Sequence, residues 1–276
     1  MGRQKTEKRS RKKSRADRAD AHALYEAAVQ CAETEIDFID AEFTRLRDRT
    51  AHYLREDFCG TANAACEWVR RRQGNYATAI DLEPSVLAWG QEHHVLKLNA
   101  AVQARVALVN ADVMSVDTPL QDIIIAMNFS YWVFKERRLL RRYFKRLRDS
   151  LVDDGVAFLD CYGGYDAFRV LKERTQHKRF TYVWDQASYN PVNGDLTCHI
   201  HFNFPDGSRM KRAFSYDWRL WTLPEIREVL TEAGFQRSVV YWQGWDDETE
   251  SGNGEFSAVE TADADAGWIC YLAALK

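Results

Sequence analysis

The stretch Leu54-Arg-Glu-Asp-Phe-Cys-Gly-Thr-Ala62 decides the fold of this chain. It has the form of a strand end, a tight turn at Gly60 and the start of a helix over 61–72. Because Gly60 has no Cβ, such a turn can bring backbone N–H groups and a helix N-terminus close to a ligand. The stretch therefore predicts a ligand site at the end of this strand.

A second segment, Ala79-Ile-Asp-Leu-Glu-Pro84, indicates which ligand the turn serves. It reads as an apolar strand that ends at Asp81, and Pro84 is typical of the first turn of a following helix. In a doubly wound sheet, an acid in this place lies near the two hydroxyls of a bound ribose. Gly60 and Asp81 together predict a nucleoside-containing ligand.

The middle of the chain alternates strand-like and helix-like segments. Strands are expected up to residue 58 and over 77–81, 106–109, 122–127 and 156–160, with helices over 61–72, 84–93 and 136–150. This alternation predicts an α/β fold, a doubly wound and mostly parallel sheet with helices on both faces. The Lys and Arg residues of helix 136–150 are interpreted as a solvated face and not as a nucleic-acid groove.

The alternation stops after residue 160. Three β-type segments over 180–186, 196–204 and 209–218 predict an antiparallel β insertion, a meander placed at about 178–219. A capped helix over 222–234, a strand at 239–242, a polar acidic loop over 246–266 and a last apolar strand over 267–274 follow.

The N-terminal part divides into a basic tail over 1–18 and a helical cap over 19–50, in which a break near 31–34 indicates one or two helices. The tail holds nine Lys/Arg against Glu7 and Asp17. An arm for RNA, DNA or an acidic partner would have this charge, but without interleaved aromatic residues we favour a disordered, solubilising tail. Residues 51–276 are expected to form one domain that contains the meander.

Composition excludes several classes of protein. The 276 residues are 46% hydrophobic and 29% charged with a net charge of −3, which is ordinary for a soluble globular protein. We find no apolar run that suits a membrane span or a secretory signal, so the expected location is the cytoplasm. The six cysteines include no C-x-x-C pair, which argues against a zinc cluster and against a disulfide framework.

Four segments resemble class I S-adenosylmethionine-dependent methyltransferases, over about residues 50–275. They are the cofactor loop 56–62, where Phe58 and Ala62 replace two of the family's three glycines, and the segments 80–87, 109–113 and 125–131. The resemblance implies S-adenosylmethionine as cofactor and a seven-stranded sheet with an antiparallel final strand. A nicotinamide dinucleotide is the competing ligand, but the sequence lacks the intact G-x-G-x-x-G that its pyrophosphate requires.

The resemblance also implies cofactor-binding residues. Asp81 would hold the ribose hydroxyls, Asp112 and Val113 the adenine, and either Glu56 or Asp57 would take the part of the acid that begins the family's loop. The N-terminal helix could bring a tyrosine back over the ligand. The full set of expected cofactor-binding residues is Tyr25, Arg55, Glu56, Asp57, Phe58, Cys59, Gly60, Thr61, Asp81, Leu82, Asp112, Val113 and Asn128.

The methyl acceptor is expected over the strand ends, between the segment after Met127 and the meander. A cage of aromatic side chains suits an amine or a methylated cation, and Arg219 could hold a carboxylate. The expected substrate-binding residues are Ser130, Tyr131, Trp132, Tyr162, Trp184, Tyr216, Trp218 and Arg219.

His199 and His201 stand two apart, so both project from one face of a strand. Because histidine ordinarily titrates near neutrality, these two are the candidates for a general base, with Tyr131 as a third candidate for a catalytic residue. A metal site is not expected, since no third ligand lies at a recognisable spacing.

These observations predict methyl transfer by direct displacement to a small molecule, with an amine nitrogen favoured over oxygen or a carboxylate. The meander after the fifth strand resembles that of small-molecule N-methyltransferases such as those acting on glycine or on amino sugars. Two alternatives stay open. One is a methyltransferase for RNA or another macromolecule docked by the basic tail, and the other is a cofactor-binding module without catalysis.

Overall fold

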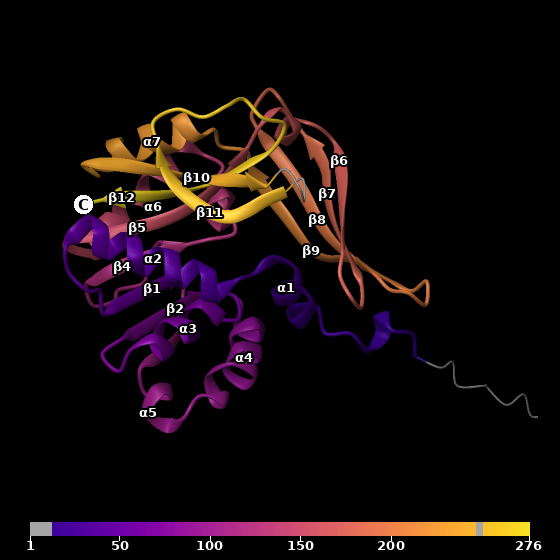
Figure 1. Ribbon diagram of the computed structural model, residues 1–276, viewed down its shortest axis with the longest axis horizontal. Coiled ribbons are helices and arrows are strands. Elements are labelled where there is room, and N and C mark those ends of the chain that lie inside the picture. The colour runs from indigo at the N-terminus through magenta and orange to yellow at the C-terminus, as the bar shows by residue number, and fades with distance from the viewer. Residues whose placement is uncertain (1–12, 247–250) are drawn as a thin grey trace, which may run out of the picture.

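The computed structural model describes residues 13–246 and 251–276, and these form two β-sheets with helices around the larger one (Figure 1). The larger sheet has eight strands in the order β11-β10-β12-β5-β4-β1-β2-β3. Its strands are β1 Tyr53–Asp57, β2 Tyr76–Asp81, β3 Val106–Asn110, β4 Gln121–Ala126, β5 Leu151–Gly163, β10 Arg237–Asp246, β11 Ser251–Val259 and β12 Trp268–Leu275.

The first five strands of this sheet are parallel to one another, and β12 runs antiparallel to both β5 and β10. Parallel strands put their carboxyl ends on one edge, and ligands bind outside that edge in open α/β sheets. The mostly parallel sheet and its antiparallel final strand confirm the fold class expected from the sequence.

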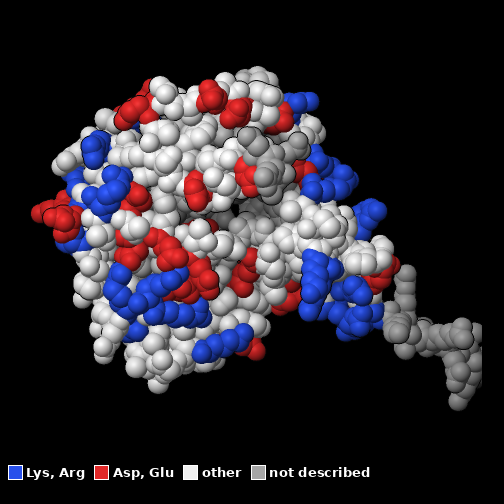
Figure 2. All heavy atoms as spheres, in the orientation of Figure 1, with Lys and Arg blue, Asp and Glu red and all other residues white. Residues whose placement is uncertain are grey.

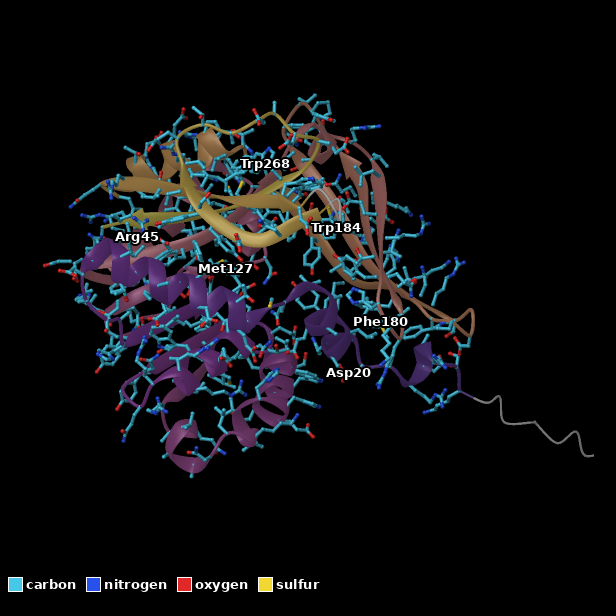
Figure 3. All side chains as sticks on the ribbon, in the orientation of Figure 1. Asp20, Arg45, Met127, Phe180, Trp184 and Trp268 are labelled. Carbon is cyan, nitrogen blue, oxygen red and sulfur yellow. The ribbon has the colours of Figure 1, made fainter. Side chains whose placement is uncertain are left out.

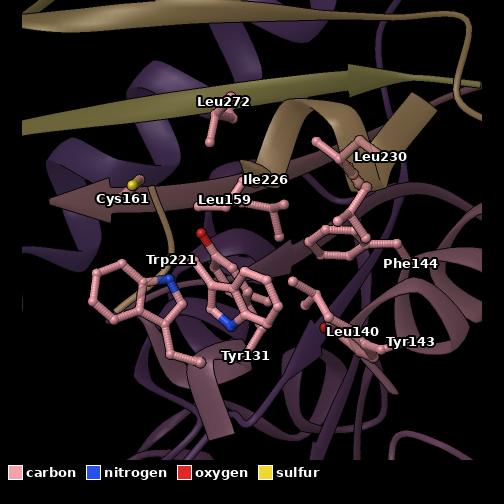
Figure 4. Close-up of a cluster of buried hydrophobic side chains, with 14 of the residues drawn as sticks. Tyr131, Leu140, Tyr143, Phe144, Leu159, Cys161, Trp221, Ile226, Leu230 and Leu272 are labelled. Atoms are coloured by element: carbon pink, nitrogen blue, oxygen red, sulfur yellow. The ribbon is translucent and has the colours of Figure 1, made fainter. Parts of the chain in front are cut away.

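Helices cover both faces of the sheet because its central strand is apolar on both faces. Ile123 and Ile125 of β4 face a core built with α2, α3 and α4, whereas Ile124 faces a core built with α6 and α7 (Figure 4). The bounds are α2 Ala32–Arg47, α3 Asn63–Arg71, α4 Pro84–His93, α5 Ala100–Gln103, α6 Arg137–Asp149 and α7 Leu223–Glu232, with short 3₁₀ turns η2 Val95–Lys97, η3 Ser130–Val133 and η4 Tyr165–Phe168.

The second sheet is antiparallel, with the strand order β6-β7-β8-β9. Its bounds are β6 Leu171–Gln176, β7 Thr181–Tyr189, β8 Asp195–Asn203 and β9 Arg209–Arg219. Helix α1 (Ala21–Val29) packs Leu24 and Tyr25 against one face of this sheet, which we call the inner face. The 3₁₀ turn η1 (Ala16–Arg18) lies beside β9 (Figure 1).

Three expectations about single elements need correction. The segment expected as a polar loop over 246–266 contains β11, which pairs with β10 and gives the sheet an eighth strand where seven were expected. The antiparallel sheet has a fourth strand, β6, before the three that were expected. Residues 152–155, expected as the end of a helix, belong to β5, because this strand begins at Leu151 directly after α6.

The N-terminal region agrees with two helices, since α1 ends at Val29 and α2 begins at Ala32. Residues 1–12 of the expected basic tail lie outside the described residues. In the described part of the chain, no helix has the length and apolar character to cross a membrane.

Candidate active site

The turn after β1 keeps a left-handed backbone at three alternate positions. Phe58, Gly60 and Ala62 have φ values of 56°, 53° and 58°. These are the three positions at which the resembled cofactor loop carries glycine, so the backbone shape is present even where the glycines are replaced. A left-handed conformation costs an ordinary residue roughly 1–2 kcal/mol, and the surrounding structure must hold it.

Asp81 at the end of β2 closes onto this turn. One carboxylate oxygen accepts a hydrogen bond from the Gly60 N–H at 2.8 Å, and the other accepts from the Glu83 N–H at 2.9 Å. A Cβ added at Gly60 would meet no atom within 4 Å, so the turn faces open space that a ligand can enter. This cradle beside a carboxylate fits the ribose end of a nucleoside cofactor.

Asp112 lies on the same edge of the sheet as Asp81. Asp81 pairs in register with Asn110 of β3, and Asp112 follows two residues later. One Asp112 carboxylate oxygen accepts from the Met114 N–H at 2.8 Å, and the side chain is exposed. Leu82 is also exposed at this edge, and Val113 is buried. Asp81 and Asp112 therefore lie at one edge of the sheet, as a shared nucleoside site needs.

The two acids that end β1 point to opposite faces of the sheet. Glu56 accepts a hydrogen bond from the Ala65 N–H of α3 at 2.8 Å, on the side of the turn. Asp57 forms a buried ion pair with Arg55 at 2.6 Å and accepts from the Tyr143 hydroxyl of α6 at 3.0 Å. Only Glu56 therefore borders the turn, while Arg55 and Asp57 bind each other and α6.

Three buried or partly buried carboxyl groups lie close to one another behind the turn. Burial raises the pKa of Glu56 to about 8, the pKa of Asp160 to about 8 and the pKa of Glu35 to about 7. The charge of Glu35 on α2 raises the pKa of both Glu56 and Asp160 further. Like charges in a poorly solvated space repel, so this cluster favours a cationic ligand.

Asp160, the acid at the end of the expected fifth strand, holds the segment after β4. Its carboxylate accepts from the Asn128 N–H at 2.6 Å and the Phe129 N–H at 2.8 Å. Both residues have left-handed φ values, 57° and 58°. Asp160 thus fixes two consecutive strained residues, and both of them line the cavity described below.

Helix α1 is bonded to the turn through Glu26. Its carboxylate accepts from the Thr61 hydroxyl at 2.5 Å and lies 2.6 Å from Nε2 of His94 on α4. Burial raises the pKa of Glu26, but the hydrogen bonds from His94 and Thr61 outweigh it and lower the pKa overall. Tyr25, which precedes Glu26 in the chain, lines the cavity. Helix α1 therefore contacts both the turn and the cavity in which the methyl acceptor is expected.

A cavity of about 1060 Å³ lies between α1, the inner face of the antiparallel sheet and the ends of β5, β10 and β12. The surface is hollowed near the centre of the view in Figure 2. Trp184 and Trp268 line it from the two different sheets (Figure 3). The aromatic lining residues include Tyr25, Phe129, Tyr162, Tyr182, Trp184, Tyr216, Trp218, Trp242, Trp245 and Trp268.

The charged groups of the cavity wall are all acidic among the described residues. Asp166, Glu173, Asp263 and Asp265 line it, and no Lys, Arg or His does. Asp166 is paired with Arg169 at 2.7 Å, whereas Glu173, Asp263 and Asp265 are exposed. Aromatic faces with carboxylates favour a cation and disfavour a carboxylate ligand.

Four of the expected substrate residues lie outside the cavity wall. Tyr131 and Trp132 are fully buried in the α6–α7 core (Figure 4), and Tyr131 donates to the Asp160 carbonyl at 2.7 Å. Ser130 donates to the Met127 carbonyl at 2.8 Å. Arg219 stacks on Trp221 and pairs with Glu225 at 2.9 Å. The other four, Tyr162, Trp184, Tyr216 and Trp218, do line the cavity.

His199 and His201 share one face of β8, as expected, but it is the outer face of the antiparallel sheet. Their neighbour Ile200 lines the cavity from the inner face. His199 bonds the Ser215 hydroxyl at 2.8 Å, and His201 bonds Asp185 at 3.1 Å. The sheet separates both imidazoles from the cavity, so their placement gives no support for a general-base role. The described residues contain no group of ligands that could hold a metal ion.

Two further expected residues support the turn without facing the open cradle. The Phe58 ring packs against Phe134 and Tyr143 at centroid distances of 6.0 and 5.7 Å. Cys59 is buried and donates its N–H to the Ile80 carbonyl at 2.9 Å. Both hold the turn against its neighbours.

Sequence reasoning assigned no site role to Glu26, Glu35, Asp160, Trp242 or Trp268. One signal was available for Asp160, because it ends the apolar strand expected at 156–160 as Asp81 ends the one expected at 77–81; the observed β5 continues to Gly163. No local signal existed for Glu26 and Glu35, which lie on amphipathic helices whose docking depends on tertiary contacts. The sequence indicates only that Trp242 and Trp268 belong to apolar strands. Whether their side chains face the cavity depends on what covers the sheet.

Comparisons with known proteins identify the fold. Neither family models nor curated protein sequences match this chain. Among solved structures, a methyltransferase dependent on S-adenosylmethionine from Clostridium acetobutylicum has 15% identity and a TM-score of 0.65, covering 91% of this chain and 96% of its own.

Two further structures are described as acting on sugars. CalS10 from Micromonospora echinaspora, an amino pentose methyltransferase, has 13% identity and a TM-score of 0.64 over 92% of this chain and 95% of its own. The sugar N-methyltransferase KedS8 from Streptoalloteichus has 15% identity and a TM-score of 0.60 over 98% of both chains. At such identities the likeness shows the fold.

Proposed function

We propose that this chain, which has the fold of S-adenosylmethionine-dependent methyltransferases, transfers a methyl group from that cofactor to an amine nitrogen of a small molecule. The observation that carries the proposal is the aromatic and acidic cavity of about 1060 Å³, whose wall includes Tyr25 of α1, the helix that Glu26 bonds to the turn at Thr61. The small-molecule N-methyltransferases among the structural neighbours support it.

The cradle would hold the cofactor through residues on one sheet edge. Asp81 would accept hydrogen bonds from the ribose hydroxyls, because a carboxylate can accept about four and uses two here. Asp112 would take the adenine side. The carboxyl groups of Glu35, Glu56 and Asp160 would offset the positive charge of the cofactor.

When bound, S-adenosylmethionine supplies a methyl carbon that its sulfonium charge makes electrophilic. The chain's contribution is to position the acceptor, and such positioning can lower a bimolecular barrier by roughly 7–11 kcal/mol. The aromatic wall formed by Trp184, Trp218 and Tyr162 would orient the acceptor and exclude water. The carboxylates at the exposed part of the wall would attract an ammonium group from solvent and could accept its proton before transfer.

The test separates cofactor binding from turnover. Asp81→Asn should weaken S-adenosylmethionine binding at least about tenfold, because a charge-assisted hydrogen bond is worth roughly 1.5–3 kcal/mol. Titration calorimetry measures this, with Asp117→Asn on an exposed position as the matched control. If the folded Asp81 variant keeps wild-type affinity, the cradle does not bind the cofactor.

Turnover is then measured by transfer of a labelled methyl group to a panel of amines, alcohols and carboxylates. We expect transfer to amines, and Trp184→Ala should raise the KM for the best amine. Cofactor binding without transfer to any acceptor would instead indicate a binding module, and transfer to carboxylates alone would contradict the acidic-cavity argument.

A further inference from the structure

The outer face of the antiparallel sheet carries a second charged surface, distinct from the cavity. On β6, Glu173 and Thr175 line the cavity. Lys172 and Arg174 alternate with them along the strand and therefore project to the outer face. On β9, Arg209 and Lys211 flank Met210, which packs in the core of the inner face. We call the set Arg174, Lys178, Arg179, Arg209, Lys211 and Arg212 the basic face.

The basic face has unpaired positive charges. All six side chains are exposed, and none forms an ion pair within the part of the chain that the structure describes. The acids on the same face have cationic partners, since Asp185 binds Lys172 at 2.8 Å and Asp217 binds Lys135 at 2.9 Å. Figure 2 shows Lys and Arg side chains along the side of the molecule where this sheet lies.

The N-terminal segment starts beside this face. The Arg15 N–H donates to Asp206 at 2.9 Å, and the Ala16 N–H donates to the Ser208 hydroxyl at 3.1 Å. Asp206 and Ser208 form the turn that leads directly into Arg209. Arg15 therefore lies beside the turn that begins the basic face.

These cations are a local excess of unpaired charge on a chain with a net charge of −3, whereas five of the seven Lys and Arg side chains on α6 are paired with acids. A row of cations at the strand spacing suits a ligand with regularly repeated anionic groups. The central strand position on this face, Val183, is 4% exposed, so the face offers no apolar side chain there for insertion into a lipid surface. The imidazoles of His199 and His201 on this face are bonded to Ser215 and Asp185, so they are not free rings on which bases could stack.

We propose that the basic face binds the phosphate backbone of a nucleic acid without reading its sequence. The cavity opens on the other face of the same sheet, so this surface docks a nucleic acid and does not deliver a base to the cavity. The proposal does not depend on the methyl-transfer activity.

Fluorescence anisotropy of the full chain with a labelled RNA strand and its duplex tests the proposal. Five or six phosphate contacts predict a slope of log affinity against log salt of about −4 for the single strand, at about −0.7 for each contact. The double variant Arg179→Glu, Lys211→Glu should weaken binding at least about tenfold and reduce the slope by about 2. If this reversal of charge disturbs folding, the milder double variant Arg179→Gln, Lys211→Gln provides the same test.

The matched control is Arg141→Glu, Arg142→Glu on α6, an equal charge change at two exposed arginines. It should leave RNA binding unchanged, and S-adenosylmethionine affinity by calorimetry should stay the same in both double variants. The proposal is overturned if the full chain binds no RNA at low salt, if the α6 control weakens binding as much, or if anionic vesicles bind where RNA does not.

Discussion

Three residues in the turn after β1 take the same left-handed backbone, and only Gly60 is a glycine. Phe58 and Ala62 tolerate it because each is fixed by packing. The Phe58 ring lies between Phe134 and Tyr143, and Ala62 is fully buried. Gly60 differs, since its missing side chain leaves open space and not a packed contact. The glycine that the turn retains is the one that faces open space, where we propose that the cofactor binds.

This difference predicts the outcome of Gly60→Ala. The added Cβ would lower the free energy of unfolding by only roughly 1–2 kcal/mol, from backbone strain, because it meets no protein atom within 4 Å. It would project into the cradle and weaken cofactor binding at least about tenfold, corresponding to about 1.4 kcal/mol. Urea unfolding and titration calorimetry measure the two effects separately.

Ala62→Gly serves as the control at the same turn. It relieves a left-handed residue but loses a buried methyl group worth about 0.8 kcal/mol, so its stability should change by less than about 1 kcal/mol. Its cofactor affinity should match that of the unmodified chain. Equal loss of affinity in both variants would contradict the assignment of Gly60 to the cradle.

At the scale of elements, α1 contacts both the turn of the larger sheet and the inner face of the antiparallel sheet. Its N-cap residue Asp20 accepts from the Trp89 indole N–H of α4 at 2.8 Å, and Glu26 binds Thr61 and His94. From its opposite side, Tyr25 packs on Phe214 of β9 with ring centroids 5.0 Å apart. One short helix thus covers both the turn and the cavity, so its stability sets access to the site.

Glu26→Gln should loosen α1 without unfolding the domain. The substitution replaces a charge-assisted acceptor by a neutral amide, and we expect a loss of about 1 kcal/mol after allowance for partial exposure of the pair. Hydrogen exchange of the α1 amides should become about fivefold faster. Exchange in β4 should stay unchanged, and Glu33→Gln on the exposed side of α2 should alter neither. Unaltered α1 exchange in the Glu26 variant would show that this contact does not hold the helix.

At the scale of the whole molecule, the carboxyl cluster links cofactor binding to pH. Glu35 comes from α2, Glu56 from β1 and Asp160 from β5, so no single element contains it. Burial raises their pKa values to about 7, about 8 and about 8. Because the pKa of each acid is raised by burial, its carboxyl group stays protonated in the ligand-free fold at pH values where it is ionised in the unfolded chain. Stability of the ligand-free protein should therefore fall as pH rises from about 4.5 to about 8.

Cofactor binding should show the opposite dependence. A cation favours the ionised carboxylates, so binding releases protons and affinity should increase between pH 6 and pH 8, by up to about tenfold per pH unit for each proton released. Calorimetry in buffers of different ionisation enthalpy counts these protons. Glu35→Gln should reduce the count. Affinity that is flat or falls over this range would show that the cluster does not face the cofactor's charge.

Local sequence signals are enough to predict these elements and the sheet edge at which we propose the nucleoside site. The helix at 84–93 and the strand ending at Asp81 have the predicted bounds to within a residue, because Pro84, the apolar runs and the cap residues act locally. Asp81 and Asp112 meet at one edge because parallel strands leave no other place for residues at their carboxyl ends.

Which face of each element borders the cavity depends instead on long-range packing. Period-two alternation puts His199 and His201 on one face and Ile200 on the other, but nothing local says which face α1 covers. Trp132 and Trp184 are both aromatic, yet one lies in the core and the other lines the cavity. Strand β11, formed from a polar acidic segment, exists because β10 offers it an unpaired edge. The residue types fix what each side chain can do, and long-range packing fixes what it meets.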